Sequence, residues 1–281
     1  MSELNSNYEY CDQLVKDFEK VVKNPIRESS SVYYTGVDLG TACVVLAVVD
    51  ENRRPVAGAY RYADVVRDGM VVDYIGAINI VRELKREVEE KLGAELIYGA
   101  AAIPPGTDEL DSGAVKNVVQ AAGFELTNVL DEPTAANKVL KIQNGAVVDI
   151  GGGTTGISIL KDGKVVYIAD EPTGGTHFSL VVSGAYRMSF ADAELFKRDT
   201  ANHRELIPVL KPVVEKISSI INQHIKGYDV KEISLVGGTC CLTGIEEIIE
   251  KKTGIFTHKP QNPMFVTPLG IALSCTQESI G

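Results

Sequence analysis

The segment from Ala146 to Leu160 combines an acid, three consecutive glycines and two threonines between two apolar runs. Three glycines in a row remove every Cβ from the bend, so successive backbone N–H groups can converge on one anion such as a phosphate. Thr154 and Thr155 add hydroxyl donors. Asp149 would repel that phosphate unless a divalent cation or a polarised water lay between them. The pattern indicates a nucleotide site at Gly151, Gly152, Gly153, Thr154 and Thr155; the competing interpretation is a glycine-rich hairpin without a ligand.

An earlier segment, residues 34–49, has the same plan of apolar strand, acidic glycine turn and apolar strand. Its turn contains Asp38, Gly40 and Thr41. Each copy continues into a further turn and strand, and the second turn has Asp162 and Gly163 at its centre, which is a hairpin signal. The chain therefore contains a weak internal repeat. We expect two similar lobes, each with one phosphate loop.

Composition limits the class of protein. The chain has 281 residues, 44% of them apolar, and the sequence shows no apolar run of membrane length, so we expect a soluble globular protein with two lobes. The polar, acidic start is unlike a signal peptide, and five scattered cysteines favour a reducing cytoplasm over a disulfide framework. Twenty-eight basic against 38 acidic residues give a net charge of −10. This balance argues against nucleic acid and anionic membrane as partners.

Residues 8–23 form a predicted amphipathic helix, followed by a polar linker that ends at Ser31. Two interpretations are open for the helix. It packs on its own domain or on a second copy of the chain, or it is a docking tag that binds a partner's groove.

The remaining apolar spacing predicts an alternation of helices and strands. Gly93 is expected to close a long helix from about Tyr74 to Leu92. A buried strand from Ile233 should end in a glycine turn at Gly237, Gly238 and Thr239. Further helices are expected over residues 111–122, 208–225 and 245–252, and from about residues 133, 178, 190 and 268; further strands are expected over 96–103 and 129–130.

Five short motifs, in order along residues 32–274, resemble those of the actin/Hsp70/sugar-kinase superfamily. They are the phosphate 1, connect 1, phosphate 2, adenosine and connect 2 motifs, carried here by residues 38–41, 132–136, 149–155, 236–239 and the helix around Gly270. The resemblance implies a two-lobed, actin-like (ribonuclease H-like) α/β fold. Its lobes would be residues 32–143 with 262–281, and residues 144–261, after an N-terminal helix and linker over residues 1–31.

Three stretches, residues 63–69, 103–108 and 130–135, more closely resemble the EutJ family, chaperone-like proteins of ethanolamine-utilisation operons. Two others, residues 67–73 and 191–197, resemble the bacterial MreB and cell-division actin relatives. The EutJ resemblance implies a cytoplasmic, ATP-binding protein that works beside a bacterial microcompartment. Its implied partners are ethanolamine ammonia-lyase or microcompartment proteins.

The resemblance also implies roles for individual residues, with ATP and Mg²⁺ as cofactors. Asp38 and Asp149 would hold Mg²⁺ mostly through water, and Glu132 or Asp149 would orient the attacking water. Gly40, Thr41 and residues 151–154 would bind the phosphates, and Gly237 and Gly238 would lie against adenosine. Ala42 stands where Hsp70 relatives have a second threonine, and no lysine matches their catalytic one. Nucleotide binding is therefore expected, while hydrolysis is less secure.

Three classes of function compete. The first is an ATP-driven chaperone or reactivation factor, with slow hydrolysis, whose lobes close on ATP about the helices near Pro133 and Pro268. The second is a nucleotide-switched assembly protein of the MreB/actin type without significant turnover. The third, a small-molecule kinase, is disfavoured because no acid stands in a convincing substrate-base context.

Overall fold

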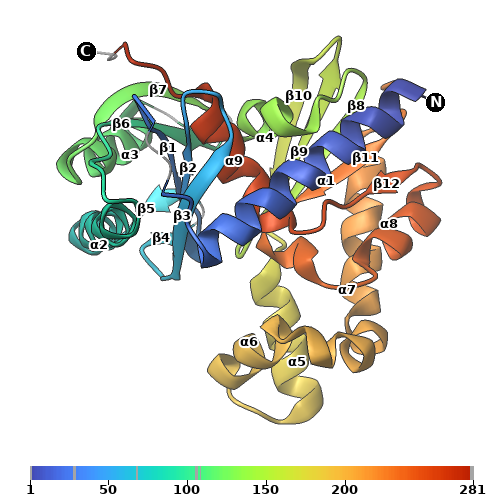
Figure 1. The fold of residues 1–281 in the computed structure, drawn as a ribbon. Helices are drawn as coiled ribbons and strands as arrows, with labels where there is room; N and C mark the ends of the chain where they lie inside the picture. The colour runs from blue at the N-terminus through green and yellow to red at the C-terminus, as the bar shows by residue number, and fades with distance from the viewer. Residues whose placement is uncertain (1, 28–29, 68, 105–106, 108, 279–281) are drawn as a thin grey trace. The chain divides into compact units, whose positions relative to one another are not determined.

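The structure is a computed structural model, and it describes every residue except 1, 28–29, 68, 105–106, 108 and 279–281. The chain divides into two compact units, which can be followed by colour in Figure 1. Unit 1 contains residues 1–141 and 265–281, and unit 2 contains residues 142–264. Four residues of the stretches that resemble EutJ, at positions 68, 105, 106 and 108, lie outside the described residues.

Unit 1 contains a five-stranded mixed sheet in the order β3-β2-β1-β6-β7. The strands β1, β2 and β3 pair antiparallel, whereas β6 lies parallel to β1 and β7 lies parallel to β6. A small hairpin, β4 with β5, stands apart from this sheet. The strand bounds are β1 Tyr34–Leu39, β2 Cys43–Val49, β3 Pro55–Tyr62, β4 Val66–Arg67, β5 Met70–Val71, β6 Tyr98–Ile103 and β7 Glu125–Asp131.

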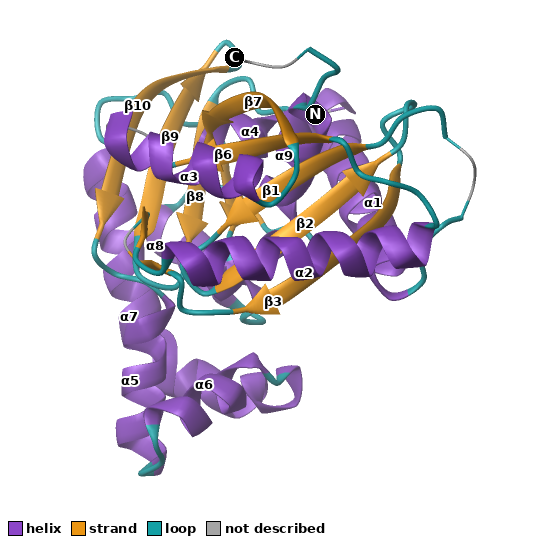
Figure 2. Cartoon of the chain, turned by 90° about the vertical axis from the view of Figure 1, so that its left-hand side faces the viewer, coloured by secondary structure: helices purple, strands orange, loops and turns teal. Residues whose placement is uncertain are grey.

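Helices cover both faces of this sheet. On one face lie α2 (Tyr74–Leu92) and α3 (Glu109–Ala121), as Figure 2 shows. On the other lie α1 (Ser2–Lys23), α4 (Glu132–Leu140) and α9 (Val266–Ser274). Successive side chains of β1 point to opposite faces of the sheet, so the strand packs against both helix layers. Val37 and Leu39 join the apolar core that contains α2 and α3, whereas Gly36 lies against the backbone of α9.

The long helix predicted for residues 74–92 is present with those bounds. Asp73 caps its start by accepting a hydrogen bond from the Gly76 amide, and the left-handed Gly93 ends it by donating to the Glu89 carbonyl. Of the stripe expected from the spacing, Ile78, Val81, Leu84 and Val88 are buried, whereas Ile75 in the first turn is 71% exposed. Local sequence and tertiary packing agree over this helix.

The apolar stripe of α1 is buried within unit 1. Phe18 is fully buried, meets the Phe265 ring edge-on at 5.0 Å and fills the space that a side chain at Gly58 of β3 would need. Cys11 and Val15 are also fully buried. In this docked position the stripe is covered by the protein's own residues.

Unit 2 repeats the plan of unit 1. Its sheet has the order β10-β9-β8-β11-β12, again with three antiparallel strands followed by two parallel ones. This identical order confirms the repeat inferred from the two glycine turns. The strand bounds are β8 Gly145–Ile150, β9 Thr155–Lys161, β10 Lys164–Glu171, β11 Ile233–Val236 and β12 Thr257–His258.

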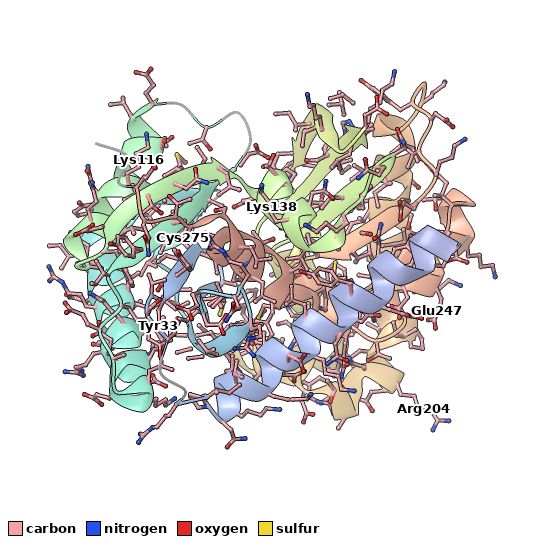
Figure 3. The ribbon with its side chains drawn as sticks, turned by 45° about the horizontal axis from the view of Figure 1, so that its top comes forward. Tyr33, Lys116, Lys138, Arg204, Glu247 and Cys275 are labelled. Carbon is pink, nitrogen blue, oxygen red and sulfur yellow. The ribbon has the colours of Figure 1, made fainter. Side chains whose placement is uncertain are left out.

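The core of unit 2 lies between this sheet and three helices, α5 (Gly175–Tyr186), α7 (His203–His224) and α8 (Ile245–Thr253), while α6 (Phe190–Arg198) packs on α5. Short 3-10 turns cover Thr200–Asn202, Gly238–Cys241 and Pro263–Phe265. Charges suit the helix ends: in Figure 3, Lys138 lies in the last turn of α4, and Glu247 lies in the first turn of α8. Among the described residues, no helix is both long and apolar enough to cross a membrane.

The predicted starts of two helices were wrong. We expected a helix over residues 208–225, but α7 begins at His203 and contains both Pro208 and Pro212. Both prolines are on the exposed side, whereas Leu206, Leu210 and other residues of the stripe are buried. Packing of that stripe stabilises the helix although each proline lacks a backbone donor. Similarly, α5 begins at Gly175 instead of near Phe178.

The close crossing of α4 and α9 depends on Gly270. A Cβ built on Gly270 would lie 1.8 Å from the Ala135 carbonyl oxygen, which is far inside the contact distance. Gly36 permits a second close approach, since its Cβ would meet the Ala272 amide at 2.4 Å. The helix α9 is therefore held against α4 and β1 at positions where no side chain fits.

We expect Gly270→Ala to destabilise unit 1 by about 3 kcal/mol, because the added methyl group must push two helix backbones apart. Gly184→Ala is the matched control, since it also lies in a helix and its Cβ would have nothing within 4 Å. There the same change should raise stability by about 0.5 to 1 kcal/mol. Urea unfolding followed by circular dichroism measures both; equal stability of the two variants would contradict the crossing.

Candidate functional site

In each unit, the residues singled out from the sequence lie at the carboxyl ends of parallel strands, where α/β sheets bind ligands. In unit 1, Asp38 is near the end of β1, Gly40 and Thr41 form the following bend, and Glu132 follows the end of β7. Since β6 pairs with both β1 and β7, these ends share one edge of the sheet.

The bend after β1 is tight, because a Cβ on Gly40 would lie 2.8 Å from the Cys43 carbonyl oxygen. Asp38 and Thr41 are each partly exposed beside it. This bend supplies one acid and one hydroxyl next to backbone amides, as the sequence predicted for a phosphate loop.

Glu132 is the first residue of α4 and is half-buried. It does not cap the helix, because Asp131 does so by accepting hydrogen bonds from the Thr134 amide and the Thr134 hydroxyl, both at 2.8 Å. The two neighbouring acids therefore have different surroundings, and the capping role that Glu132 could have had belongs to Asp131.

In unit 2, the glycine loop after β8, residues 151–154, is held from behind through its carbonyl oxygens. The Gly151 carbonyl accepts from the Gly175 amide at 2.9 Å and from the Thr239 hydroxyl at 2.8 Å. The Gly152 carbonyl accepts from the Thr176 amide at 2.8 Å. We call residues 151–154 the phosphate-2 loop; the start of α5 and the turn after β11 hold it in place.

These contacts leave the amides of the phosphate-2 loop available. Among the residues that the structure describes, the amides of Gly152, Gly153 and Thr154 have no hydrogen-bond acceptor. Backbone N–H groups without a partner need water or an anion. Successive amides of this kind form a phosphate cradle, and a Cβ at Gly174 would press to 2.8 Å from the Thr154 nitrogen behind it.

Thr155 differs from its expected role as a ligand. Its side chain is fully buried and its hydroxyl donates to the Thr173 carbonyl, so it supports the start of β9 from inside the unit. Thr239 likewise uses its hydroxyl on the Gly151 carbonyl. Both threonines shape the loop, and their hydroxyls are already engaged.

Only glycine fits at position 237. Its φ is +91°, and a Cβ there would lie 2.2 Å from Oδ1 of Asp149. The strand β11 runs beside β8 with Val236 opposite Asp149, so this contact follows from the strand register. The next residue, Gly238, is exposed, with nothing within 4 Å of its Cβ position. The turn thus offers an open backbone surface beside the acid.

A second acid, Asp170, lies near Asp149. It is opposite Gly156 in the pairing of β9 with β10, and a Cβ on Gly156 would be 3.9 Å from Cβ of Asp149 and 4.0 Å from Oδ1 of Asp170. Burial, and then the charge of Asp170, raise the pKa of Asp149 to about 6. Asp170 could not be predicted from the sequence, because only the pairing of β9 with β10 brings it close to Asp149.

Lys197 of α6 is another residue that the sequence analysis did not assign. Its ammonium group donates to the Gly175 carbonyl at 3.0 Å and to the Ser179 hydroxyl and the Glu194 carboxylate at 2.8 Å. Burial lowers the pKa of Lys197, although the charge of Glu194 opposes that shift. A buried cation therefore lies at the start of α5, directly behind the phosphate-2 loop. In the sequence, Lys197 was marked only by its place in residues 191–197, which resemble a stretch of the MreB relatives.

The donors present fit Mg²⁺ bound through water. Among the described residues, no three His, Cys, Asp or Glu side chains form a group that could ligate a metal. Mg²⁺ usually keeps several waters and binds one or two carboxylates together with substrate phosphates. Asp149 meets that requirement, because it lies beside amides that could bind the phosphates. Its negative charge is unfavourable in the folded protein when no cation is present.

Comparisons with known proteins agree on the type of fold. The family model described as "Type IV pilus assembly protein PilM" matches residues 115–265. The ethanolamine utilization protein EutJ of Salmonella typhimurium strain LT2 is 46% identical over 247 residues, which cover 88% of this chain and 87% of that protein. The EutJ protein of Escherichia coli K12 is 45% identical and covers 90% of both chains.

Solved structures give the same picture. The crystal structure of EutJ from Carboxydothermus hydrogenoformans superposes with a TM-score of 0.88 at 48% identity and covers 95% of this chain and 99% of that one. MreB 5 of Spiroplasma citri bound to AMPPNP gives a TM-score of 0.70 at 17% identity, covering 87% of this chain and 96% of that one. This second likeness concerns the fold alone, and it confirms the expected two-lobed actin-like α/β fold.

Without ligand, Asp149 should destabilise the folded protein above its raised pKa. Below pH 3.8 the carboxyl is protonated in both the folded and unfolded states, so the shift has no effect. As pH rises toward the folded-state pKa of about 6, only the folded state resists ionisation, and stability falls. A shift of roughly two pK units corresponds to at most about 3 kcal/mol.

We therefore expect Asp149→Asn to increase the free energy of unfolding of the ligand-free protein at about pH 7.5, and to have little effect at about pH 4. Urea unfolding at both pH values measures it. Asp162→Asn, in the exposed turn between β9 and β10, is the control and should change neither value. A less stable Asp149→Asn protein at about pH 7.5 would show that the folded protein favours the carboxylate without a cation.

Proposed function

The chain belongs to the family of the ethanolamine utilization protein EutJ, and from this we propose that it binds ATP with Mg²⁺ and hydrolyses it slowly as a chaperone-like protein of ethanolamine utilisation. Its clients would be ethanolamine ammonia-lyase or proteins of the microcompartment. The family supports the role in ethanolamine utilisation. The arrangement of side chains and amides supports the binding and hydrolysis of ATP.

The observation that carries this proposal is the phosphate-2 loop. Two of its carbonyls are bonded from behind, and three successive amides are left without an acceptor among the described residues. A loop with three unpaired amides favours an anion. A glycine hairpin without a ligand would have no reason to leave these amides unpaired. MreB 5, which has the same fold, was crystallised with AMPPNP, and this supports a nucleotide as the anion.

Roles follow from the chemistry of each group. The amides of Gly152, Gly153 and Thr154 would bind phosphate oxygens, as would those around Gly40 and Thr41 in the other unit. When bound, Mg²⁺ would neutralise phosphate charge. Asp38 and Asp149 would hold it mostly through water.

Two further groups complete the inventory. Asp170 would act as an additional acceptor for the metal's water ligands, because it lies across Gly156 from Asp149. Gly238, with open space over its Cα, would lie against the adenosine.

Hydrolysis needs little beyond these groups, because phosphoryl transfer depends mainly on positioning and charge neutralisation. Glu132 begins α4 at the edge of the sheet where β1 and β7 end, so its carboxylate would orient the attacking water and accept its proton. Asp149 would share the positioning of that water. Neither a catalytic lysine nor a second threonine after Thr41 is matched in this chain, and this favours a slow rate.

We expect Mg·ATP to raise the melting temperature of the wild-type protein, since a ligand at a hundred times its dissociation constant adds about 2.7 kcal/mol to stability. Asp38→Ala and Asp149→Ala should remove that rise. Asp229→Ala is the control, because it changes an exposed acid whose partner is Lys231. Differential scanning fluorimetry provides the measurement, and a wild-type melting curve unaffected by Mg·ATP would end the nucleotide proposal.

We expect Glu132→Gln to bind ATP normally and to lose most ATP hydrolysis, because the amide cannot accept the proton of the attacking water. Phosphate release under steady-state conditions measures the rate. Asp131→Asn is the matched control: asparagine also caps helices, so both the fold and the rate should be kept. An unchanged rate in Glu132→Gln would leave Asp149 as the residue that positions the water.

A further inference from the structure

His203, the first residue of α7, is 4% exposed and lies between two segments that the proposed function uses. One is the turn and loop after β11, residues 237–244, which we call the base loop. The other is the end of α6 at Lys197. We propose that His203 is a positioning residue that fixes the base loop and so sets affinity for the nucleoside part of the ligand. This inference rests on the proposed function and extends it to nucleotide selectivity.

The two backbone groups around the ring define its tautomer. The Thr243 amide donates to Nδ1 of His203 at 3.1 Å, so Nδ1 must be the unprotonated nitrogen. Nε2 lies 3.0 Å from the Lys197 carbonyl, which can only accept, so Nε2 carries the proton. The ring is therefore held neutral in one tautomer, with the Thr243 hydroxyl as a further neighbour at 3.0 Å from Nδ1.

The contacts continue from His203 to the phosphate-2 loop. Lys197 accepts from His203 through its carbonyl and donates to the Gly175 carbonyl through its ammonium group. The Gly175 amide in turn donates to the Gly151 carbonyl. Three successive contacts therefore connect His203 with the loop that would bind the phosphates, and the bond from the Thr243 amide to His203 joins the base loop to them.

The base loop is fixed differently at its two ends. Near its start, the Thr239 hydroxyl bonds to the Gly151 carbonyl. Near its end, Lys259 donates to the Leu242 carbonyl at 3.2 Å and His203 accepts from Thr243. Loss of the imidazole would remove one of the two side-chain contacts that hold the end of the base loop, while the Thr239 contact would still hold the phosphate-2 loop. The nucleoside should therefore be affected more than the phosphates.

Charged groups around the ring act in both directions. Burial lowers the pKa of His203; the bond to the Lys197 carbonyl and the charge of Asp199 raise it, and Lys259 lowers it. Lys259 is itself paired with Glu246 at 2.6 Å. Protonation in acid would put a hydrogen on Nδ1, facing the Thr243 amide. The hydroxyl of Thr243 could accept that hydrogen, but the amide bond would be lost.

The test compares Mg·ATP with Mg·triphosphate, an inorganic probe that has the phosphates and lacks the nucleoside. Isothermal titration calorimetry gives both dissociation constants, and their ratio is the nucleoside preference. Protonation of phosphates and of acids near them affects both ligands, so it largely cancels in the ratio. The wild-type protein is measured at a series of pH values from about 8 down to about 4.5, because burial lowers the pKa of His203 below that of an ordinary histidine.

Three variants are compared with the wild type. His203→Leu keeps most of the volume and removes both ring contacts. His203→Gln can donate to the Lys197 carbonyl and accept from the Thr243 amide, and it does not titrate. Arg204→Gln is the matched control, because Arg204 is the next residue and its side chain is exposed (Figure 3).

We expect His203→Leu to reduce the nucleoside preference about tenfold, with triphosphate affinity unchanged within about twofold. His203→Gln should restore most of the preference and show no change with pH, whereas the wild-type preference should fall in acid. Nitrogen NMR of the ligand-free wild type should show a neutral ring protonated on Nε2, and this readout stands even where His203→Leu fails to fold.

The inference is overturned by an unchanged preference in His203→Leu, by an equal loss for both ligands, or by a ring protonated on Nδ1. It is also overturned when the wild type binds ATP and triphosphate equally well, a result that leaves phosphate binding intact. A wild-type protein that binds neither ligand refutes the proposed function itself, and the inference with it.

Discussion

The hydrogen bonds to the carbonyls of Gly151 and Gly152 determine what the phosphate-2 loop can do. In a trans peptide the carbonyl and the next residue's amide point in opposite directions, so these bonds turn the amides of Gly152 and Gly153 outward, next to the Thr154 amide. The start of α5 and the hydroxyl of Thr239 supply those bonds, so two segments distant in sequence prepare a loop that glycine alone would leave flexible. Preparation of this kind lowers the entropic cost of binding a phosphate.

The same unit carries a stability cost at Asp149. The Asp149 carboxyl is desolvated, lies against the turn at Gly237 and is close to the charge of Asp170. Its ionised form is therefore unfavourable in the folded protein. A residue kept for stability alone would not be placed there. Sites that bind ligands commonly accept such a cost, and a cation with phosphates would remove it by neutralising the carboxylate.

The sequence alone was enough for features determined by local pattern. The bounds of α2, its end at Gly93 and the two acidic glycine turns were predicted from spacing and turn chemistry. It was insufficient where tertiary packing decides: the stripe of α7 carries the helix past Pro208. Asp170 and His203 act through strand pairing and backbone groups of other segments, so no residue spacing could have indicated them.

Unit 2 is one continuous stretch of chain inserted into unit 1, whose last helix, α9, is translated only after unit 2. On the ribosome, unit 2 can complete its core while unit 1 still lacks the helix that packs on β1 and α4. Until α9 arrives, Gly36 and Ala135 face an unfilled place in the nascent protein. Unit 1 therefore completes its core only after α9 has been translated, and a chain that ended before Val266 would lack the helix that packs on β1 and α4.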